Sequence, residues 1–189
     1  SERLGVSQVD AQWVKDWGAS ESLCEQSIEE AILNMSDCFE GKIAHILSTN
    51  LPSKSAVFLA NSMSVRYAES FWKKNNSQNR IFFNRGANGI DGTLSTALGV
   101  AHKGFNTVLL TGDLAFLHDS NGLLFAANLK GSLTVIIVNN GGGGIFEHLP
   151  ISEHESFEEF FATPQNVCFQ NLSKAHKLCY VQLTDLAKL

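Results

Sequence analysis

Polar and glycine residues follow two apolar runs of this 189-residue chain, at the point where each run stops. Gly112-Asp113 follows VLLT, and Asn139-Asn140 with four glycines (141–144) follows LTVIIV. Carboxylate, amide and backbone carbonyl oxygens are ligands that Mg²⁺ accepts in proteins, together with water and phosphate oxygens. Glycines also let the backbone approach a phosphate that a Cβ atom would obstruct. The pattern therefore indicates a metal and diphosphate site.

A purely structural explanation of the same residues stays open at this stage. An Asp after a strand is often a helix N-cap, and Asn-Asn-Gly is a common turn sequence. The chain lacks the GxxxxGK[ST] phosphate loop, and no GxGxxG follows its first apolar run, so neither of those phosphate sites applies. Spacing alone does not choose between a ligand site and a pair of turns.

Short apolar runs alternate with helical patterns, and these predict the elements that would position the polar residues. Strands are expected over 55–61, 80–84, 106–112, 132–140 and, at CYVQL, 179–183. Helices are expected over 21–38, 41–48, 64–74, 91–104 with Gly104 as its C-cap, 117–131, 155–161 and 171–178, before a last helical start. The alternation predicts an α/β fold, a doubly wound and mainly parallel sheet with helices on both faces.

The carboxyl ends of the first four predicted strands are the expected place for a ligand. In doubly wound sheets, ligands bind outside these ends. Here the ends carry Asn61-Ser62, Asn84-Arg85-Gly86, Gly112-Asp113 and Asn139-Asn140-Gly141. Four consecutive strands that all end in polar or glycine residues are the strongest indication of a binding site at the level of the fold.

The composition is that of one soluble globular domain, with 44% apolar and 17% charged residues. The net charge of −5, without a Lys/Arg stripe, gives no reason to expect nucleic acid as a partner. The apolar runs are too short for a membrane span. The four cysteines (24, 38, 168 and 179) show no metal spacing, and we expect reduced thiols that mostly fill the core. Both chain ends look cut, as in a piece of a larger polypeptide.

A GD motif, an apolar stretch and an NN pair are typical of thiamine-diphosphate (ThDP) enzymes, which this chain resembles. Its stretch GDLAFLHDSNGLL…VIIVNNGGGGIFEHLP (112–150) is similar to the MenD branch, the 2-succinyl-5-enolpyruvyl-6-hydroxy-3-cyclohexene-1-carboxylate synthases of menaquinone and phylloquinone biosynthesis. ANSMSVR (60–66) and FFNRGANGIDGTLSTALG (82–99) extend the resemblance. It implies an inter-domain linker (1–20) and a diphosphate- and Mg²⁺-binding domain (21–189), with the pyrimidine-binding and middle domains elsewhere.

The resemblance implies ThDP and Mg²⁺ as cofactors, with Mn²⁺ as an alternative metal. It gives metal-binding roles to Asp113, the Asn140 side chain and the Gly142 carbonyl. Ile90 matches the bulky residue that holds ThDP bent, a position otherwise typical of an ordinary core residue. The remaining implied cofactor-binding residues are Gly112, Leu114 and three that would form an apolar wall, Ile145, Phe146 and Leu149.

Three residues receive substrate roles by resemblance, Ser62, Arg66 and Arg85. Arg85 would face substrate carboxylates, and Ser62 with Arg66 would hold the distal carboxylate of the succinyl unit from 2-oxoglutarate. On sequence alone, an N-cap Ser and two solvated Arg side chains remain alternatives. His118 and Asp119 fall inside a predicted helix, so we expect structural roles for them.

The implied function is the decarboxylation of 2-oxoglutarate and addition of the succinyl unit to isochorismate. We expect a homo-oligomer in which the partner subunit supplies the pyrimidine-binding domain, so that this chain alone is inactive. A bacterial or cyanobacterial cytoplasm is the expected location, or a plastid in a plant or alga. Two alternatives remain: a pyruvate-using enzyme of the acetolactate-synthase or decarboxylase type, which would not need Arg66 or Arg85, and a non-catalytic ThDP-like module.

Overall fold

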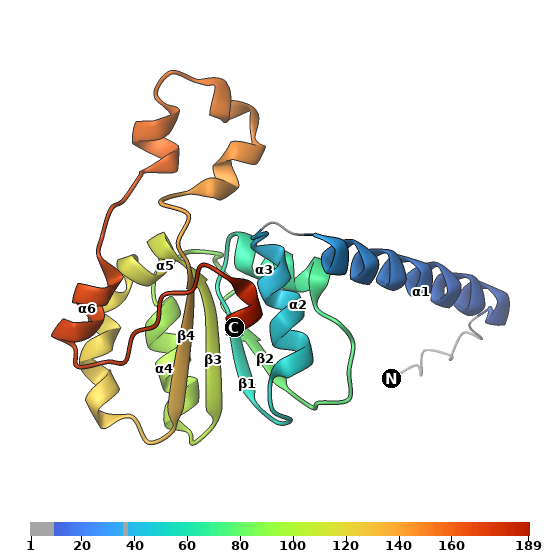
Figure 1. The fold of residues 1–189 in the computed structure, drawn as a ribbon, viewed down its shortest axis with the longest axis horizontal. Helices are drawn as coiled ribbons and strands as arrows, with labels where there is room; N and C mark the ends of the chain where they lie inside the picture. Colours follow the sequence, from blue (N-terminus) through green and yellow to red (C-terminus); the bar gives the residue numbers. More distant parts are fainter. Residues whose placement is uncertain (1–9, 36–37) are drawn as a thin grey trace, which may run out of the picture. The chain divides into compact units, whose positions relative to one another are not determined.

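The computed structural model describes residues 10–35 and 38–189, which belong to two compact units, 1–39 and 40–189 (Figure 1). The first unit contains one long helix, α1 (Ala11–Asn34), whose N-cap Asp10 accepts hydrogen bonds from the backbone N–H groups of Gln12 and Trp13. The predicted helix over 21–38 is right in type but wrong in its start, and positions 36–37 lie outside the described residues. A continuous helix crosses the predicted linker–domain boundary at residue 20, so no structural break marks it.

The second unit is built on a four-stranded parallel sheet of order β2-β1-β3-β4. Its strands are β1 (Ala56–Leu59), β2 (Arg80–Phe83), β3 (Asn106–Gly112) and β4 (Ser132–Val138), which confirms four predicted strands. The order of winding reverses between β1 and β3, which creates a switch point at their carboxyl ends. The fifth predicted strand, 179–183, is wrong: these residues join no ladder in the described structure, and Val181 is 76% exposed.

Helices cover both faces of the sheet, which confirms the doubly wound α/β fold (Figure 1). Val57 and Leu59 of β1 pack in one core cluster with α2 (Gly41–Asn50) and α3 (Met63–Phe71). Phe58, which points the other way, packs in a second cluster with α4 (Thr93–His102), α5 (Asp113–His118), the 3₁₀ helix η1 (Ser120–Asn128) and α6 (Phe169–Ala175). Successive strand residues face opposite sides, so this buried strand needs apolar residues throughout.

The helix predicted over 117–131 is wrong, because two shorter helices replace it. The α-helix α5 starts at Asp113, the helix is interrupted at Asp119, and the chain continues as the 3₁₀ helix η1. Asp119 accepts hydrogen bonds from the backbone N and the Oγ of Ser95, and this contact holds it out of helical geometry. Gly122 allows η1 to approach α4, because a Cβ there would lie 2.9 Å from Ser95 Oγ.

The remaining segments are short. They comprise the 3₁₀ turns η2 (Gly144–His148), η3 (Pro150–Glu153) and η5 (Leu186–Lys188), and a π-helical turn, η4 (Glu158–Ala162), in place of the helix predicted over 155–161. α6 starts two residues before the helix predicted over 171–178 and ends at Ala175. Gly104 follows α4 with φ +94° and donates its N–H to Ala101 O, which confirms its C-cap role.

The expectation that the cysteines fill the core is wrong. Cys24, Cys38, Cys168 and Cys179 are free and exposed. They lie on α1, in connections or at a helix end, whereas the core consists of aliphatic and aromatic side chains from both faces of the sheet. Among the described helices, none has the length and apolar character that a bilayer span requires.

Leu109→Ala is expected to destabilise the protein by about 2–5 kcal/mol, because Leu109 of β3 is fully buried beside Phe58 and Leu94 and its loss leaves a cavity. Denaturant titration of the complete polypeptide measures the change. Leu124→Ala, at a position 73% exposed, is the matched control and should change stability by less than about 0.5 kcal/mol. Equal losses from the two substitutions would contradict the assigned core.

Candidate functional site

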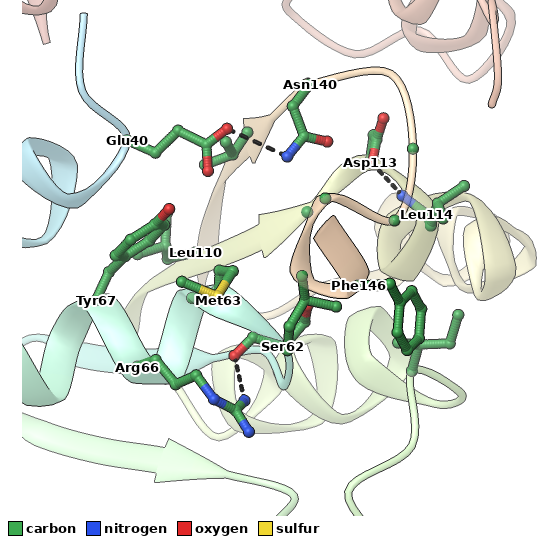
Figure 2. A pocket seen from close by; sticks show the side chains of 18 of the residues that line it. Glu40, Ser62, Met63, Arg66, Tyr67, Leu110, Asp113, Leu114, Asn140 and Phe146 are labelled. Atoms are coloured by element: carbon green, nitrogen blue, oxygen red, sulfur yellow. Dashed lines mark hydrogen bonds between the residues drawn. The ribbon is translucent and has the colours of Figure 1, made fainter. Parts of the chain in front are cut away.

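A cavity of about 470 Å³ lies at the carboxyl ends of the strands (Figure 2). The ends of β1, β3 and β4, the loop after β2 and the first turn of α3 contribute to its wall. All predicted site residues except Leu149 line it: Ser62, Arg66, Arg85, Ile90, Gly112, Asp113, Leu114, Asn140, Gly142, Ile145 and Phe146. Leu149 lies beyond η2 and is 49% exposed, so the structure does not bring it to the cavity wall.

Asp113 is the buried acid of the site, only 1% exposed. Its Oδ1 accepts a hydrogen bond from Leu114 N at 2.7 Å, and its Oδ2 accepts from Gly141 N at 2.9 Å and Gln165 Nε2 at 2.7 Å. The parallel pairing of Gly112 with Val138 brings Asp113 beside the glycine loop. All three donors are neutral, so within residues 10–35 and 38–189 no Lys or Arg balances the carboxylate. Such a buried acid favours a cation beside it.

Asn140 presents its amide oxygen in a fixed direction. Its Nδ2 donates to Glu40 Oε1 at 3.2 Å (Figure 2). An ionised carboxylate only accepts hydrogen bonds, so the amide nitrogen faces Glu40 and Oδ1 is turned away from it.

Steric contacts require glycine in the loop after β4, residues 141–144, which we call the glycine loop. A Cβ on Gly142 would lie 2.5 Å from Ala162 O, and one on Gly143 would lie 2.6 Å from Phe161 O. Gly141 has φ +85°, a conformation that favours glycine. The loop therefore lies closer to residues 161–162 than any other residue type would allow.

The donor set fits Mg²⁺. The site offers one carboxylate, an amide oxygen at Asn140 and a carbonyl at Gly142, all of them hard oxygen ligands. The described part of the chain contains no cluster of three or more His, Cys, Asp and Glu side chains. One carboxylate leaves room for phosphate oxygens and water in an octahedral shell.

Ser62 occupies a strained turn between β1 and α3. Its φ of 68° and ψ of −136° are unusual for a residue other than glycine, and such strain costs about 1–3 kcal/mol. The Ser62 carbonyl accepts a hydrogen bond from Arg66 Nη1 at 2.8 Å (Figure 2). Both residues line the cavity, and their joint role toward a substrate carboxylate stays a prediction.

Arg85 is held in the cavity wall by Asn61. Its Nη1 donates to Asn61 Oδ1 at 2.9 Å, while Asn61 Nδ2 donates to the carbonyls of Asn84 (2.9 Å) and Gly89 (2.7 Å). Asn61 is 3% exposed and thereby fixes the loop between β2 and α4, which also carries Ile90. With Arg66, this gives the cavity two guanidinium groups, which suit carboxylate ligands.

Sequence reasoning missed Glu40, Tyr67 and Gln165. Glu40 and Tyr67 line the cavity, and burial raises the pKa of the Tyr67 phenol, with the charge and hydrogen bond of Glu40 adding to the shift. Gln165 reaches Asp113 from 52 residues away. In the sequence, a single Glu before a helix and a loop Gln look like surface residues, and no local pattern marks their contacts.

Asp119 makes a structural contact, whereas the expectation of a structural role for His118 stays a prediction. Neither residue lines the cavity. His118 is exposed, and Asp119 accepts hydrogen bonds from Ser95 N at 2.6 Å and Ser95 Oγ at 2.9 Å. Ser95 is the third residue of α4, so Asp119 satisfies an otherwise unpaired N–H group of that helix from outside.

Asp119→Asn is expected to lower the free energy of unfolding by about 1 kcal/mol, because an amide is a weaker acceptor for the α4 cap. Cofactor and metal affinities should stay at their wild-type values. Denaturant titration and calorimetric binding measurements on the complete polypeptide check the two statements separately. A loss of metal affinity without a loss of stability would contradict the structural role.

Comparison with known proteins agrees with this geometry. Residues 61–188 match the family described as thiamine pyrophosphate enzyme, C-terminal TPP binding domain. The chain is 49% identical over 181 residues to the 2-succinyl-5-enolpyruvyl-6-hydroxy-3-cyclohexene-1-carboxylate synthase of Gloeothece citriformis, which covers 95% of this chain and 31% of that protein. The protein of the same name from Rippkaea orientalis is 49% identical over 176 residues, covering 93% of this chain and 30% of its own length. The chain thus spans about a third of the relatives it matches.

Among solved structures, benzoylformate decarboxylase from Polynucleobacter necessarius is similar in fold. The TM-score is 0.58 over 75% of this chain and 27% of that one, at 17% sequence identity. At this identity the similarity supports the architecture of the sheet and its helices and nothing about the substrate.

Proposed function

Because the chain belongs to the thiamine pyrophosphate enzymes, as their C-terminal TPP-binding domain, we propose that it forms the diphosphate- and Mg²⁺-binding part of a 2-succinyl-5-enolpyruvyl-6-hydroxy-3-cyclohexene-1-carboxylate synthase. The proposed reaction removes CO₂ from 2-oxoglutarate and adds the succinyl unit to isochorismate. The observation that carries the proposal is that one cavity combines the metal-ligand set with two arginines.

In this proposal, Asp113, Asn140 and the Gly142 carbonyl hold Mg²⁺ and, through it, the diphosphate. When bound, ThDP supplies the electron sink that the decarboxylation and carbon–carbon bond formation need. Ile90 provides an apolar support for the bent cofactor, and Ile145 and Phe146 keep water from the reacting atoms. Leu114 and Gly112 complete the cofactor-facing wall.

Arg85, Arg66 and Ser62 are proposed to bind and orient the acidic substrates. Both substrates carry carboxylates, and a guanidinium group binds a carboxylate through two parallel hydrogen bonds. Arg85 is already directed by Asn61, and Arg66 by the Ser62 carbonyl, so little side-chain freedom is lost on binding. A substrate without a distal carboxylate, such as pyruvate, would leave one of these cations without a partner.

The setting of the site is also part of the proposal. We infer a homo-oligomer in which a partner subunit contributes the pyrimidine-binding domain, and a cytoplasmic location. Under this proposal, a site that lacks the partner's pyrimidine-binding domain should not turn over substrate.

The test uses the complete polypeptide with ThDP and Mg²⁺, offered 2-oxoglutarate and isochorismate, with pyruvate in a parallel reaction. Mass analysis of the products is the readout. An adduct of isochorismate and a succinyl unit is expected. Conversion of pyruvate alone would favour the acetolactate-synthase type of enzyme, and ThDP binding without any product would overturn the proposed reaction.

A further inference from the structure

Gln165 lies directly behind Asp113, outside the residues that line the cavity. Its Nε2 donates to Asp113 Oδ2 at 2.7 Å and to Asn139 Oδ1 at 2.8 Å, and its Oε1 accepts from Val167 N at 2.8 Å. Both amide hydrogens and the amide oxygen are therefore engaged, which fixes the orientation of the group. Gln165 connects the residue after β3 with a residue after β4.

The backbone around Gln165 also holds the glycine loop. Gln165 N donates to Gly141 O at 3.1 Å, and Gly143 N donates to Ala162 O at 2.6 Å. These two bonds join the residues on either side of Gly142, the proposed carbonyl ligand, to one segment. That segment begins with Ala162, the last residue of the π-helical turn η4, a rare conformation that is frequent at functional sites.

The chemistry of Gln165 suits a support for a metal ligand. An ionised carboxylate has about four acceptor positions, and Asp113 uses three of them for Leu114, Gly141 and Gln165. One position remains for a cation. A Lys or Arg at 165 would neutralise the carboxylate and compete with the metal, whereas an amide orients it and leaves its charge intact.

We propose that Gln165 is a positioning residue of the metal site, which sets the orientation of the Asp113 carboxylate for Mg²⁺. This inference rests on the proposed function, because it presumes that Mg²⁺ and ThDP bind in the cavity. Residues that orient metal ligands typically change metal affinity 10- to 100-fold when they are replaced. The side chain acts through Asp113 and does not itself reach the cavity.

The test compares Gln165→Met with the wild type in the complete polypeptide. Methionine has a similar length and no amide, so packing is retained and the hydrogen bonds are lost. Mg²⁺ is titrated calorimetrically at a saturating ThDP concentration, and thermal unfolding is recorded without metal. The expected result is a Mg²⁺ dissociation constant raised by about 10- to 100-fold. Gln170→Met, on the exposed side of α6, is the matched control and should leave the constant unchanged.

Each result of this experiment supports or overturns the positioning role of Gln165. If Gln165→Met lowers the unfolding temperature but binds Mg²⁺ as the control does, Gln165 is merely structural and the inference is overturned. If Gln165→Met does not fold, Gln165→Asn, which keeps an amide one methylene too short, replaces it with the same expected rise. If the wild type binds neither Mg²⁺ nor ThDP, the proposed function fails, and the inference with it.

Discussion

Asp113→Asn is expected to weaken Mg²⁺ binding in the presence of ThDP roughly a thousandfold, which corresponds to several kcal/mol of lost metal interaction. The substitution keeps the size of the side chain and removes its charge. In the asparagine, an NH₂ group replaces one of the two carboxylate oxygens. It then faces at least one of the N–H groups of Leu114, Gly141 and Gln165, and that buried donor loses its acceptor. Product formation by the complete polypeptide should fall by a similar factor.

Metal titration at fixed ThDP separates this effect from a change in folding. Asp119→Asn makes the same chemical change a few residues later, at a carboxylate that caps α4 and lies outside the cavity. It should retain Mg²⁺ affinity. If Asp113→Asn kept its Mg²⁺ affinity within about tenfold of the wild type, Asp113 would not be a metal ligand.

Arg85→Met is expected to reduce kcat/KM for the acidic substrates by roughly a hundredfold, since a hydrogen-bonded charge pair with a carboxylate contributes about 1.5–3 kcal/mol. Removal of the guanidinium group also leaves Asn61 Oδ1, which is buried, without its donor. Mg²⁺ affinity should change little, because the proposed metal ligands follow β3 and β4 and not β2. Steady-state kinetics with 2-oxoglutarate and isochorismate varied in turn would show which substrate Arg85 binds.

Arg80→Met is the matched control for this experiment. Arg80 begins the strand that Arg85 follows, and its guanidinium lies 5.0 Å from the centre of the Phe105 ring, at the opposite end of β2. The Arg80→Met variant should keep the wild-type kcat and KM for both substrates. A loss confined to ThDP affinity in Arg85→Met would show that Arg85 supports the cofactor and would remove its proposed substrate role.

The four strands of the sheet were predictable because each is a short apolar run that ends in turn residues, whether it is buried throughout like β1 or largely exposed like β2. Thr107 to Leu110 and Leu133 to Val138 leave little room for another interpretation. The position of the site followed from the same pattern, since Asp113 and Asn140 come directly after paired strands. The strand at 179–183 failed because local apolar character does not supply a neighbouring strand to pair with.

The supporting residues of the site could not be read from local patterns. Gln165 and Glu40 contact Asp113 and Asn140 from 52 and 100 residues away, and their neighbours in the sequence show no periodicity that requires them. The break at Asp119 likewise depends on Ser95, which lies in a different helix. Tertiary hydrogen bonds, and not propensity, decide these positions.

The strained backbone at Ser62 lowers the stability of the fold at a residue that is proposed to serve activity. Glycine would adopt the same turn at little cost, so selection for stability alone would favour it at position 62. The serine found there instead contributes to the cavity wall, at the expense of folding free energy. Engineering for heat resistance that relaxed this turn would therefore be expected to exchange substrate recognition for robustness.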